Sequence, residues 1–102
     1  MARRTPKKYP VWLKAWRKSG SPAWPEHCSV MLVHWTDAAY SEDHPGTVDT
    51  WTVGYLKSAD EKAVTLAMEA FDDGDTRTHI TVPAGMVNEI AVLGSISLKP
   101  DV

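Results

Sequence analysis

Residues 50–71, TWTVGYLKSADEKAVTLAMEAF, decide the fold class of this chain. In the first half, large hydrophobic residues alternate with small or polar ones, which places Trp51, Val53 and Tyr55 on one face of a strand. The second half, from residue 63 onward, is rich in residues that also form helices well. It is bracketed, however, by the turn sequence SADEK and by the hairpin signal FDDGDT, and this bracketing favours a strand. The stretch therefore predicts two strands joined by a tight turn.

Three further strands surround this pair in the sequence. They are predicted at residues 29–35 (SVMLVHW), 78–82 (THITV) and 87–93 (VNEIAVL). A long loop separates the first two strands, and Gly54 marks a bend or bulge in the second. The tight connector PAGM, which contains Gly85, joins the fourth strand to the fifth. Five short strands connected in this way predict a mainly β fold, a five-stranded small barrel of SH3-like or Sm-like type.

A short amphipathic helix is predicted ahead of the strands, at residues 10–19 (PVWLKAWRKS). A proline in its first turn and a glycine just past its end support this assignment. Trp12 and Trp16 fall on one side of the helical wheel, opposite Lys14 and Arg17. A helix of about ten residues is not stable alone in water, so its tryptophan side must dock on the body, on a partner subunit or on a ligand.

The charge of the chain is divided sharply between its two parts. Residues 1–27 hold seven Lys and Arg against one Glu, a balance of +6, whereas residues 28–102 hold four against twelve acids, a balance of −8. We therefore divide the chain into a basic, Trp-rich arm at 1–27 and a small β-barrel domain at 28–102. Such an arm either reaches for phosphates on a nucleic acid or nucleotide, or docks on the acidic body of a neighbouring subunit.

Composition limits the classes to which the protein can belong. With 102 residues, 43% hydrophobic and 24% charged, the chain fits one globular domain. No apolar run approaches the roughly 20 residues that span a bilayer, and the basic N-terminus lacks the apolar core of a signal peptide, so we expect a cytoplasmic protein without membrane contacts. Cys28 is the sole cysteine, which excludes an internal disulfide and a thiolate zinc cage and favours a buried, inert thiol. The open edges of so small a barrel predict a homo-oligomer.

Catalytic and metal-binding patterns are weak. No Gly-x-Ser-x-Gly nucleophile elbow is present, and we predict a protein that is not an enzyme and uses no cofactor. His34, Asp37, Asp43 and His44 offer nitrogen and oxygen ligands, but no pair of them has helical spacing, and no metal is predicted. Asp37 is instead predicted to pin an Asx-type turn at the start of the long loop. The acidic run DDGD is interpreted as a hairpin turn and not as a calcium loop.

The order VHWTDAAYS, TVGYLKSADEKAVTLAME and ITVPAGMVNEIAVL resembles a family of small bacteriophage and prophage proteins. Their usual pattern is a Trp-x-Asp-Ala element, a Thr-Val-Gly-Tyr/Trp-Leu strand, a Leu-Ala strand and an Ile-Pro-x-Gly stretch. The matching positions are Trp35, Asp37, Ala38, Thr52, Val53, Gly54, Tyr55, Leu56, Leu66, Ala67, Val82, Pro83 and Gly85, with Val82 where Ile is usual. The resemblance implies a phage-encoded accessory protein with a compact barrel, a class that includes inhibitors sequestering the nucleotide signals of bacterial immunity. The basic arm lies outside the matched pattern.

Aromatic and basic side chains of the same region indicate a ligand site. Nucleobases stack on aromatic faces, and phosphates need cations close by. Acids at Glu42, Asp43 and Asp49 argue against a long polyanion here, because repulsion accumulates along many phosphates, and favour a compact nucleotide. For Trp35 a structural role at the open end of the barrel is also predicted. The predicted ligand-binding residues are Trp35, Tyr40, Trp51, Tyr55, Lys57, Arg77, Lys14 and Arg17.

The sequence thus predicts a phage-encoded, non-enzymatic binding protein that sequesters a small nucleotide-type ligand, such as a cyclic nucleotide immune signal. It would counter host defence in the cytoplasm of an infected bacterium. Two alternatives stay open. One is an Sm-like protein that binds RNA or DNA through its basic arm. The other is a structural or protein-inhibiting module in which the tryptophan helix is the contact surface.

Overall fold

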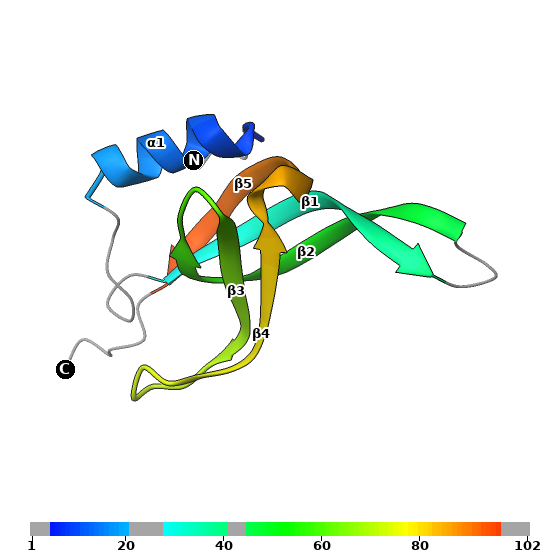
Figure 1. Cartoon of the computed structure of the whole chain (residues 1–102). Coiled ribbons are helices and arrows are strands. Elements are labelled where there is room, and N and C mark those ends of the chain that lie inside the picture. The colour runs from blue at the N-terminus through cyan, green and yellow to red at the C-terminus, as the bar shows by residue number, and fades with distance from the viewer. Residues whose placement is uncertain (1–4, 21–27, 41–44, 97–102) are drawn as a thin grey trace.

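The computed structural model describes residues 5–20, 28–40 and 45–96 of the chain. These residues form five antiparallel strands and one α-helix, which confirms the predicted mainly β fold with an N-terminal helix. The residues from 63 onward form a strand and not a helix, as their flanking turns predict. In chain order the elements are α1 (Tyr9–Lys18), β1 (Cys28–Tyr40), β2 (Pro45–Ala59), β3 (Ala63–Ala70), β4 (Thr76–Pro83), the 3-10 turn η1 (Ala84–Met86) and β5 (Val87–Ile96) (Figure 1).

The strands form a single antiparallel sheet in the order β4-β3-β2-β1-β5. β4 and β5 lie at its two edges, and no backbone pairing joins them in the described part of the chain, so the sheet is open. The five strands of the predicted barrel are therefore present, but strand pairing does not close them into a ring. The β3–β4 hairpin crosses the direction of β1 and β2 (Figure 1). Gly85 lies in η1, which is the predicted tight connector before the last strand.

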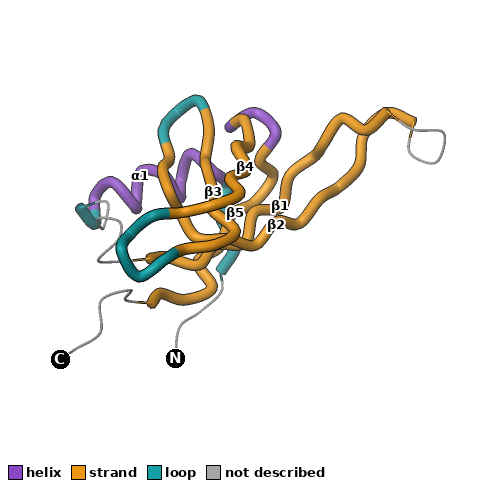
Figure 2. The backbone as a smooth tube through the Cα atoms, turned by 90° about the horizontal axis from the view of Figure 1, so that it is seen from below, coloured by secondary structure: helices purple, strands orange, loops and turns teal. Residues whose placement is uncertain are grey.

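The connection between β1 and β2 differs from the prediction. The sequence predicts a long loop over residues 36–49, but the two strands stay paired as far as Tyr40 and Pro45, and this ribbon projects from the body (Figures 1 and 2). Asp37, predicted to pin an Asx turn, pairs with Val48 inside the ribbon, so that prediction is wrong. Strands are recognised in a sequence by alternating apolar and polar residues, which mark one apolar face. The ribbon has no apolar face, so its polar sequence is interpreted as a loop.

Gly54 lies where β2 packs closely on β3. A Cβ atom added to this glycine would lie 2.7 Å from Cε of Met68 and 3.0 Å from the carbonyl oxygen of Ala67. The predicted bulge occurs further along β2, where the register with β3 shifts between Leu56 and Ser58. Gly54 is therefore required for the close approach of two strands, while the residues after it supply the irregularity that bends the sheet.

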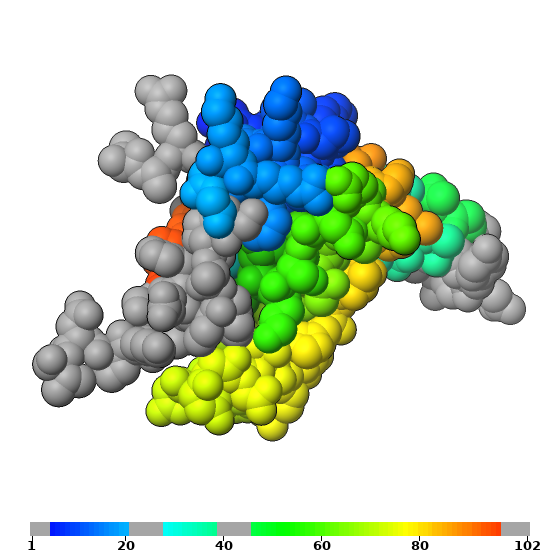
Figure 3. Space-filling model, turned by 60° about the vertical axis from the view of Figure 1, so that its left-hand side comes forward, coloured from blue at the N-terminus to red at the C-terminus, as the bar shows by residue number. Residues whose placement is uncertain are grey.

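The hydrophobic core lies between α1 and the inner face of the sheet. Tyr9, Trp12 and Leu13 of α1 are buried against side chains from all five strands. The strand residues of this core are Met31, Val33, Trp35, Leu56, Val64, Leu66, Val82 and Ile90. Of the three docking partners open to the helix, its own body is therefore the one that orders it. Figure 3 shows α1 lying directly on the part of the surface formed by β2 and the turn that follows.

Tyr9 anchors the helix to the turn between β2 and β3. Its hydroxyl donates a 2.7 Å hydrogen bond to the carbonyl oxygen of Asp60 and lies 3.2 Å from that of Ala63. The Asp60 carboxylate accepts two backbone N–H groups of the turn, which lowers its pKa. On the same turn Glu61 pairs with Arg17 of the helix, and this contact lowers the pKa of Glu61 to about 2. Residues 5–20 and the sheet thus form one body.

Candidate binding surfaces

The two tryptophans at the base of the ribbon have opposite environments. Trp35 is 7% exposed on the inner face, and its Nε1 donates a 2.9 Å hydrogen bond to Oγ1 of Thr52. Trp51 is 61% exposed on the outer face, where its ring stacks on the imidazole of His34. Trp35 is therefore a core residue with almost no ring surface for a ligand. Of the two, Trp51 alone offers the exposed aromatic face that the ligand prediction requires.

The two predicted arginines are engaged with carboxylates on separate hairpins. Arg77 of β4 donates from Nε and Nη2 to the two carboxylate oxygens of Glu69, at 3.0 and 2.8 Å. Its guanidinium also lies 5.3 Å from the ring centroid of Phe71. Arg17 of α1 pairs with Glu61 at the β2–β3 turn. Because each guanidinium already has an acidic partner, neither is an unoccupied cation for a phosphate.

The remaining predicted residues do not complete the expected site. Tyr55 and Lys57 are half-buried on β2, and Lys14 is exposed on α1. Tyr40 ends β1, but its side chain lies outside the described residues. Because the predicted cations and aromatic rings are spread over the helix, the outer sheet face and the β3–β4 hairpin, the predicted nucleotide site is not assembled as expected. Two other arrangements bring functional groups together.

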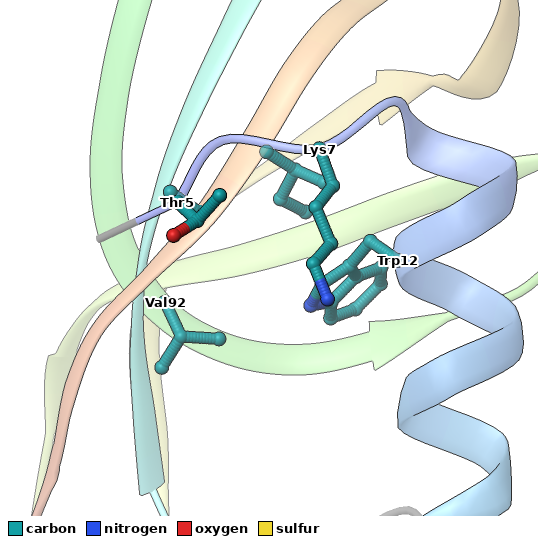
Figure 4. Close-up of a pocket in the computed structure, with 6 residues that line it drawn as sticks. Thr5, Lys7, Trp12 and Val92 are labelled. Atoms are coloured by element: carbon teal, nitrogen blue, oxygen red, sulfur yellow. The ribbon is translucent and has the colours of Figure 1, made fainter. Parts of the chain in front are cut away.

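The first arrangement is a hollow beside the N-terminal segment, here called the Lys7 hollow (Figure 4). It has a volume of about 290 Å³ and is lined by Thr5, Lys7, Trp12, Ile90, Ala91 and Val92. Lys7 forms an isolated bridge with the edge strand β5: its N–H donates to the Ile90 carbonyl at 2.9 Å, and the Ile90 N–H returns a bond of 2.8 Å. In Figure 4 the lysine side chain extends from this fixed backbone toward Trp12.

The chemistry of the Lys7 hollow suits a small anion. An ammonium group and the hydroxyl of Thr5 are donors, while the β5 residues provide an apolar floor. No lining residue is acidic, and Lys7 forms no ion pair with any residue in the described ranges. Sequence reasoning missed Lys7 because it resembles the other basic residues of the arm. Only its pairing with Ile90 distinguishes it.

The second arrangement covers the outer face of β5, β1 and β2 and consists of three cross-strand rows. The register places Glu89, His34 and Trp51 in the central row and Ala91, Leu32 and Val53 in the next row. On the other side Asn88, Thr36 and Asp49 form a polar row, in which Nδ2 of Asn88 donates to Oγ1 of Thr36 at 2.9 Å and that hydroxyl lies 3.5 Å from Oδ1 of Asp49. The outer face thus has a polar row on one side, an apolar row on the other and the row of Glu89, His34 and Trp51 between them.

A small hollow of about 110 Å³ lies on this outer face and is here called the Trp51 hollow. Its lining residues are Pro6, Leu32, His34, Trp51, Glu89, Ile90 and Ala91. The His34 and Trp51 rings are 4.4 Å apart and nearly parallel, at 3°. Nε2 of His34 is buried without a hydrogen bond, and the nearest carboxylate oxygen, Oδ1 of Asp49, lies 3.5 Å away. Trp51 was expected at a ligand site, whereas His34 and Glu89 were not expected in this role.

A third hollow, of about 320 Å³, lies between α1 and η1 and is mostly apolar. Tyr9, Pro10, Leu13, Ala84 and Gly85 line it, together with Glu61. The Glu61 carboxylate is already paired with Arg17, so the hollow offers carbon surface and no unpaired charge.

Reactive groups are sparse in the described part of the chain. Cys28 is fully buried, and burial raises the pKa of its thiol, which disfavours the nucleophilic thiolate. No group of three or more His, Cys, Asp or Glu residues at 5–20, 28–40 or 45–96 is placed to hold a metal ion. Asp73 and Asp75 belong to the tight turn between β3 and β4, where a carboxylate oxygen of Asp73 accepts the N–H of Asp75 at 2.9 Å. The hairpin interpretation of this acidic run is confirmed.

Comparison with family models, with curated proteins and with solved structures finds no match to this chain. The resemblance to small phage proteins therefore rests on the quoted residues. The helix within the described residues has neither the length nor the apolar character needed to cross a membrane.

Proposed function

We propose that this protein is a non-enzymatic binding protein that sequesters a small nucleotide-type ligand, with the Lys7 hollow as the site of its phosphate. The observation that carries the proposal is the placement of Lys7. Two backbone hydrogen bonds to Ile90 fix this residue at the edge of the sheet, where its ammonium group lines a hollow without acidic residues. A cation held in this way binds an anion with little loss of backbone freedom, which favours affinity.

The hollow favours the phosphate of such a ligand over its base. Trp12 is stacked between Tyr9 and Trp16, with centroid separations of 5.7 and 5.5 Å, and is only 5% exposed. A nucleobase therefore meets the edge of the indole and the side chain of Val92, not an open ring face. We expect selectivity for the number and position of phosphates, with weak discrimination among bases.

Calorimetry with a panel of cyclic and linear nucleotides tests this proposal. The wild type should bind at least one of them with micromolar affinity, and Lys7→Gln should weaken that binding tenfold or more, since one charge-assisted contact contributes about 1.5–3 kcal/mol. Lys14→Gln is the matched control, because it removes an exposed lysine on α1 that does not line the hollow. Absence of binding by every nucleotide, or equal losses in both variants, would remove the proposal.

The proposal also includes the SH3-like or Sm-like fold class, the phage origin with its place of action, and a homo-oligomer. Five antiparallel strands with a 3-10 turn before the last one support the SH3-like or Sm-like class. The phage origin and the cytoplasm of an infected bacterium as the place of action rest on the sequence resemblance. The homo-oligomer is supported by the edge strands of the open sheet, β4 and the part of β5 that Lys7 does not pair with. Native mass spectrometry of the full chain measures subunit number and retained ligand together.

A second candidate function, nucleic-acid binding, is supported by the outer side of the helix. Lys14 and Lys18 are exposed there, while the tryptophan side is packed into the core. The test is binding of single-stranded RNA or DNA at increasing salt, which should fall steeply if phosphates are neutralised. The double variant Lys14→Gln, Lys18→Gln should flatten the salt dependence, whereas Lys62→Gln on the β2–β3 turn should not. A salt dependence that is the same for both variants would contradict this candidate.

The protein-inhibiting alternative loses the surface on which it depends. It assigns the contact to the tryptophans of the helix, but Trp12 is buried in the protein's own core and Trp16 packs against that core. A protein partner would have to use another surface.

A further inference from the structure

We propose that the Trp51 hollow binds the guanidinium group of an arginine side chain presented by a protein partner. This inference does not depend on nucleotide binding, because His34, Trp51 and Glu89 do not line the Lys7 hollow, although the two hollows share Ile90 and Ala91.

Trp51 is exposed to an extent that is unusual for a large apolar side chain. It is 61% exposed, and Val53, two residues along the same strand, is 50% exposed. Leu32 lies beside Val53 in the cross-strand pairing and is partly exposed as well. A contiguous apolar area rimmed by polar residues is characteristic of interaction sites. His34 covers one face of the indole, so the ring is held in one orientation, as an anchor residue of an interface needs to be.

Acidic groups lie beside the stacked rings. Glu89 stands beside His34 in the central row and lines the hollow. Asp49 stands in the neighbouring polar row, with its Oδ1 3.5 Å from Nε2 of His34 and 3.5 Å from Oγ1 of Thr36. The residues that line the hollow include no Lys or Arg. The local charge therefore attracts a cation and repels a phosphate or carboxylate.

The shape and chemistry of the site select arginine among cations. A planar guanidinium stacks on an aromatic ring and at the same time donates paired hydrogen bonds to a carboxylate, which a lysine ammonium cannot do. In the central row the ring next to Glu89 is that of His34, whose other face carries Trp51. Leu32 and Val53 of the neighbouring apolar row border the central row and would contact the aliphatic stem of the arginine and an apolar neighbour in the partner. A volume of about 110 Å³ suits one side-chain head group and is small for a nucleotide.

The test is a proton–nitrogen NMR titration of the full chain with N-acetyl-arginine amide and with its neutral isostere, N-acetyl-citrulline amide. The arginine compound should shift the indole signal of Trp51 and the amide signals of the central row, with a dissociation constant in the millimolar range. The citrulline compound should bind at least threefold more weakly, because the shape is kept and the charge is lost. N-acetyl-lysine amide should also bind more weakly than the arginine compound.

Variants separate this site from general attraction to an acidic protein. Glu89→Gln and Trp51→Leu replace exposed side chains and should each weaken arginine binding at least threefold. Asp72→Asn removes an exposed acid in the β3–β4 turn and should leave binding unchanged. Lys7→Gln should not weaken arginine binding, whatever its effect on nucleotides, because it removes a nearby positive charge. Equal binding of the arginine and citrulline compounds, or equal losses in Glu89→Gln and Asp72→Asn, would overturn the proposal. A Trp51 signal that shifts with protein concentration alone would also overturn it, because a second copy would then occupy the site.

Discussion

The hydroxyl of Tyr9 and the carbonyl oxygen of Asp60 are 2.7 Å apart, a hydrogen bond that ties the N-terminal helix to the turn between β2 and β3. Replacing Tyr9 by Phe removes this bond and keeps the ring. We expect the free energy of unfolding to fall by about 1 kcal/mol, the usual net contribution of one such bond. Urea unfolding followed by circular dichroism measures it. Lys14→Gln, on the exposed side of the same helix, should leave the free energy unchanged, and an equal loss there would contradict this role of Tyr9.

Alkaline pH should destabilise the protein through the same residue. Burial, aided by the charge of Asp60, raises the pKa of Tyr9 from its ordinary 10.0 to about 12 in the folded state. The folded protein therefore favours the neutral phenol, and the resulting stability is complete below pH 10 and lost as pH rises toward 12. Thermal unfolding from pH 9 to 12 should show a steeper decline for the wild type than for Tyr9→Phe. The buried Cys28 thiol, whose pKa is also raised, contributes to both proteins alike. Parallel curves would contradict the assignment.

Gly54→Ala should be costly although alanine is small. The new methyl group would lie 3.0 Å from the backbone oxygen of Ala67, which cannot move without shifting β3, and 2.7 Å from Cε of Met68. We expect a loss of about 1–3 kcal/mol in urea unfolding, as for other overpacked sites. Gly94→Ala in β5 is the matched control, because no atom lies within 4 Å of the added carbon. A cost for Gly94→Ala as large as that for Gly54→Ala would show that strand glycines as such, and not the contact, set the effect.

Replacement by Phe should lower the stability of the protein at Trp35 but not at Trp51. Trp35→Phe removes the donor to Thr52 and leaves a small void, so the free energy of unfolding should fall by about 1–3 kcal/mol. Nucleotide affinity, measured by calorimetry, should not change. Trp51→Phe replaces an exposed side chain and should alter stability by no more than about 0.5 kcal/mol. Loss of nucleotide binding in Trp35→Phe with unchanged stability would restore this residue to the ligand site.

Local patterns were sufficient to predict most of the sheet. Flanking turns identified β3 as a strand, although its composition also suits a helix, and the connector before β5 was recognised from its proline and glycine. The ribbon could not be predicted in this way, because strand recognition depends on an apolar face and the ribbon has none. Which residues of β2 face the core could not be predicted from the sequence either. Thr52 and Gly54 face the core, where Thr52 accepts a hydrogen bond from Trp35 and Gly54 leaves room for Met68. Because side chains alternate along a strand, Trp51 and Val53 face outward.

The candidate sites depend on contacts between distant parts of the chain, and these leave little trace in the sequence. Lys7 and Lys8 are neighbours of the same type, yet only Lys7 pairs with Ile90 and lines a hollow. Glu89 gains its relation to Trp51 from the register of three strands, which composition does not specify. Arg17 and Arg77 were predicted as free cations, but each lies opposite an acid that only the folded chain brings near.

The projecting ribbon is expected to be less stable than the rest of the sheet. Beyond Trp35, β1 and β2 have no third strand beside them in the described part of the sheet, and a two-stranded hairpin alone is at best marginally stable in water. The paired residues 37–40 and 45–48 should therefore open and reclose many times during the lifetime of the folded body, with amide protons exchanging faster there than in the rest of β1. Trp51 lies at the base of the ribbon, so a side chain bound in the Trp51 hollow would also slow the opening of the whole ribbon.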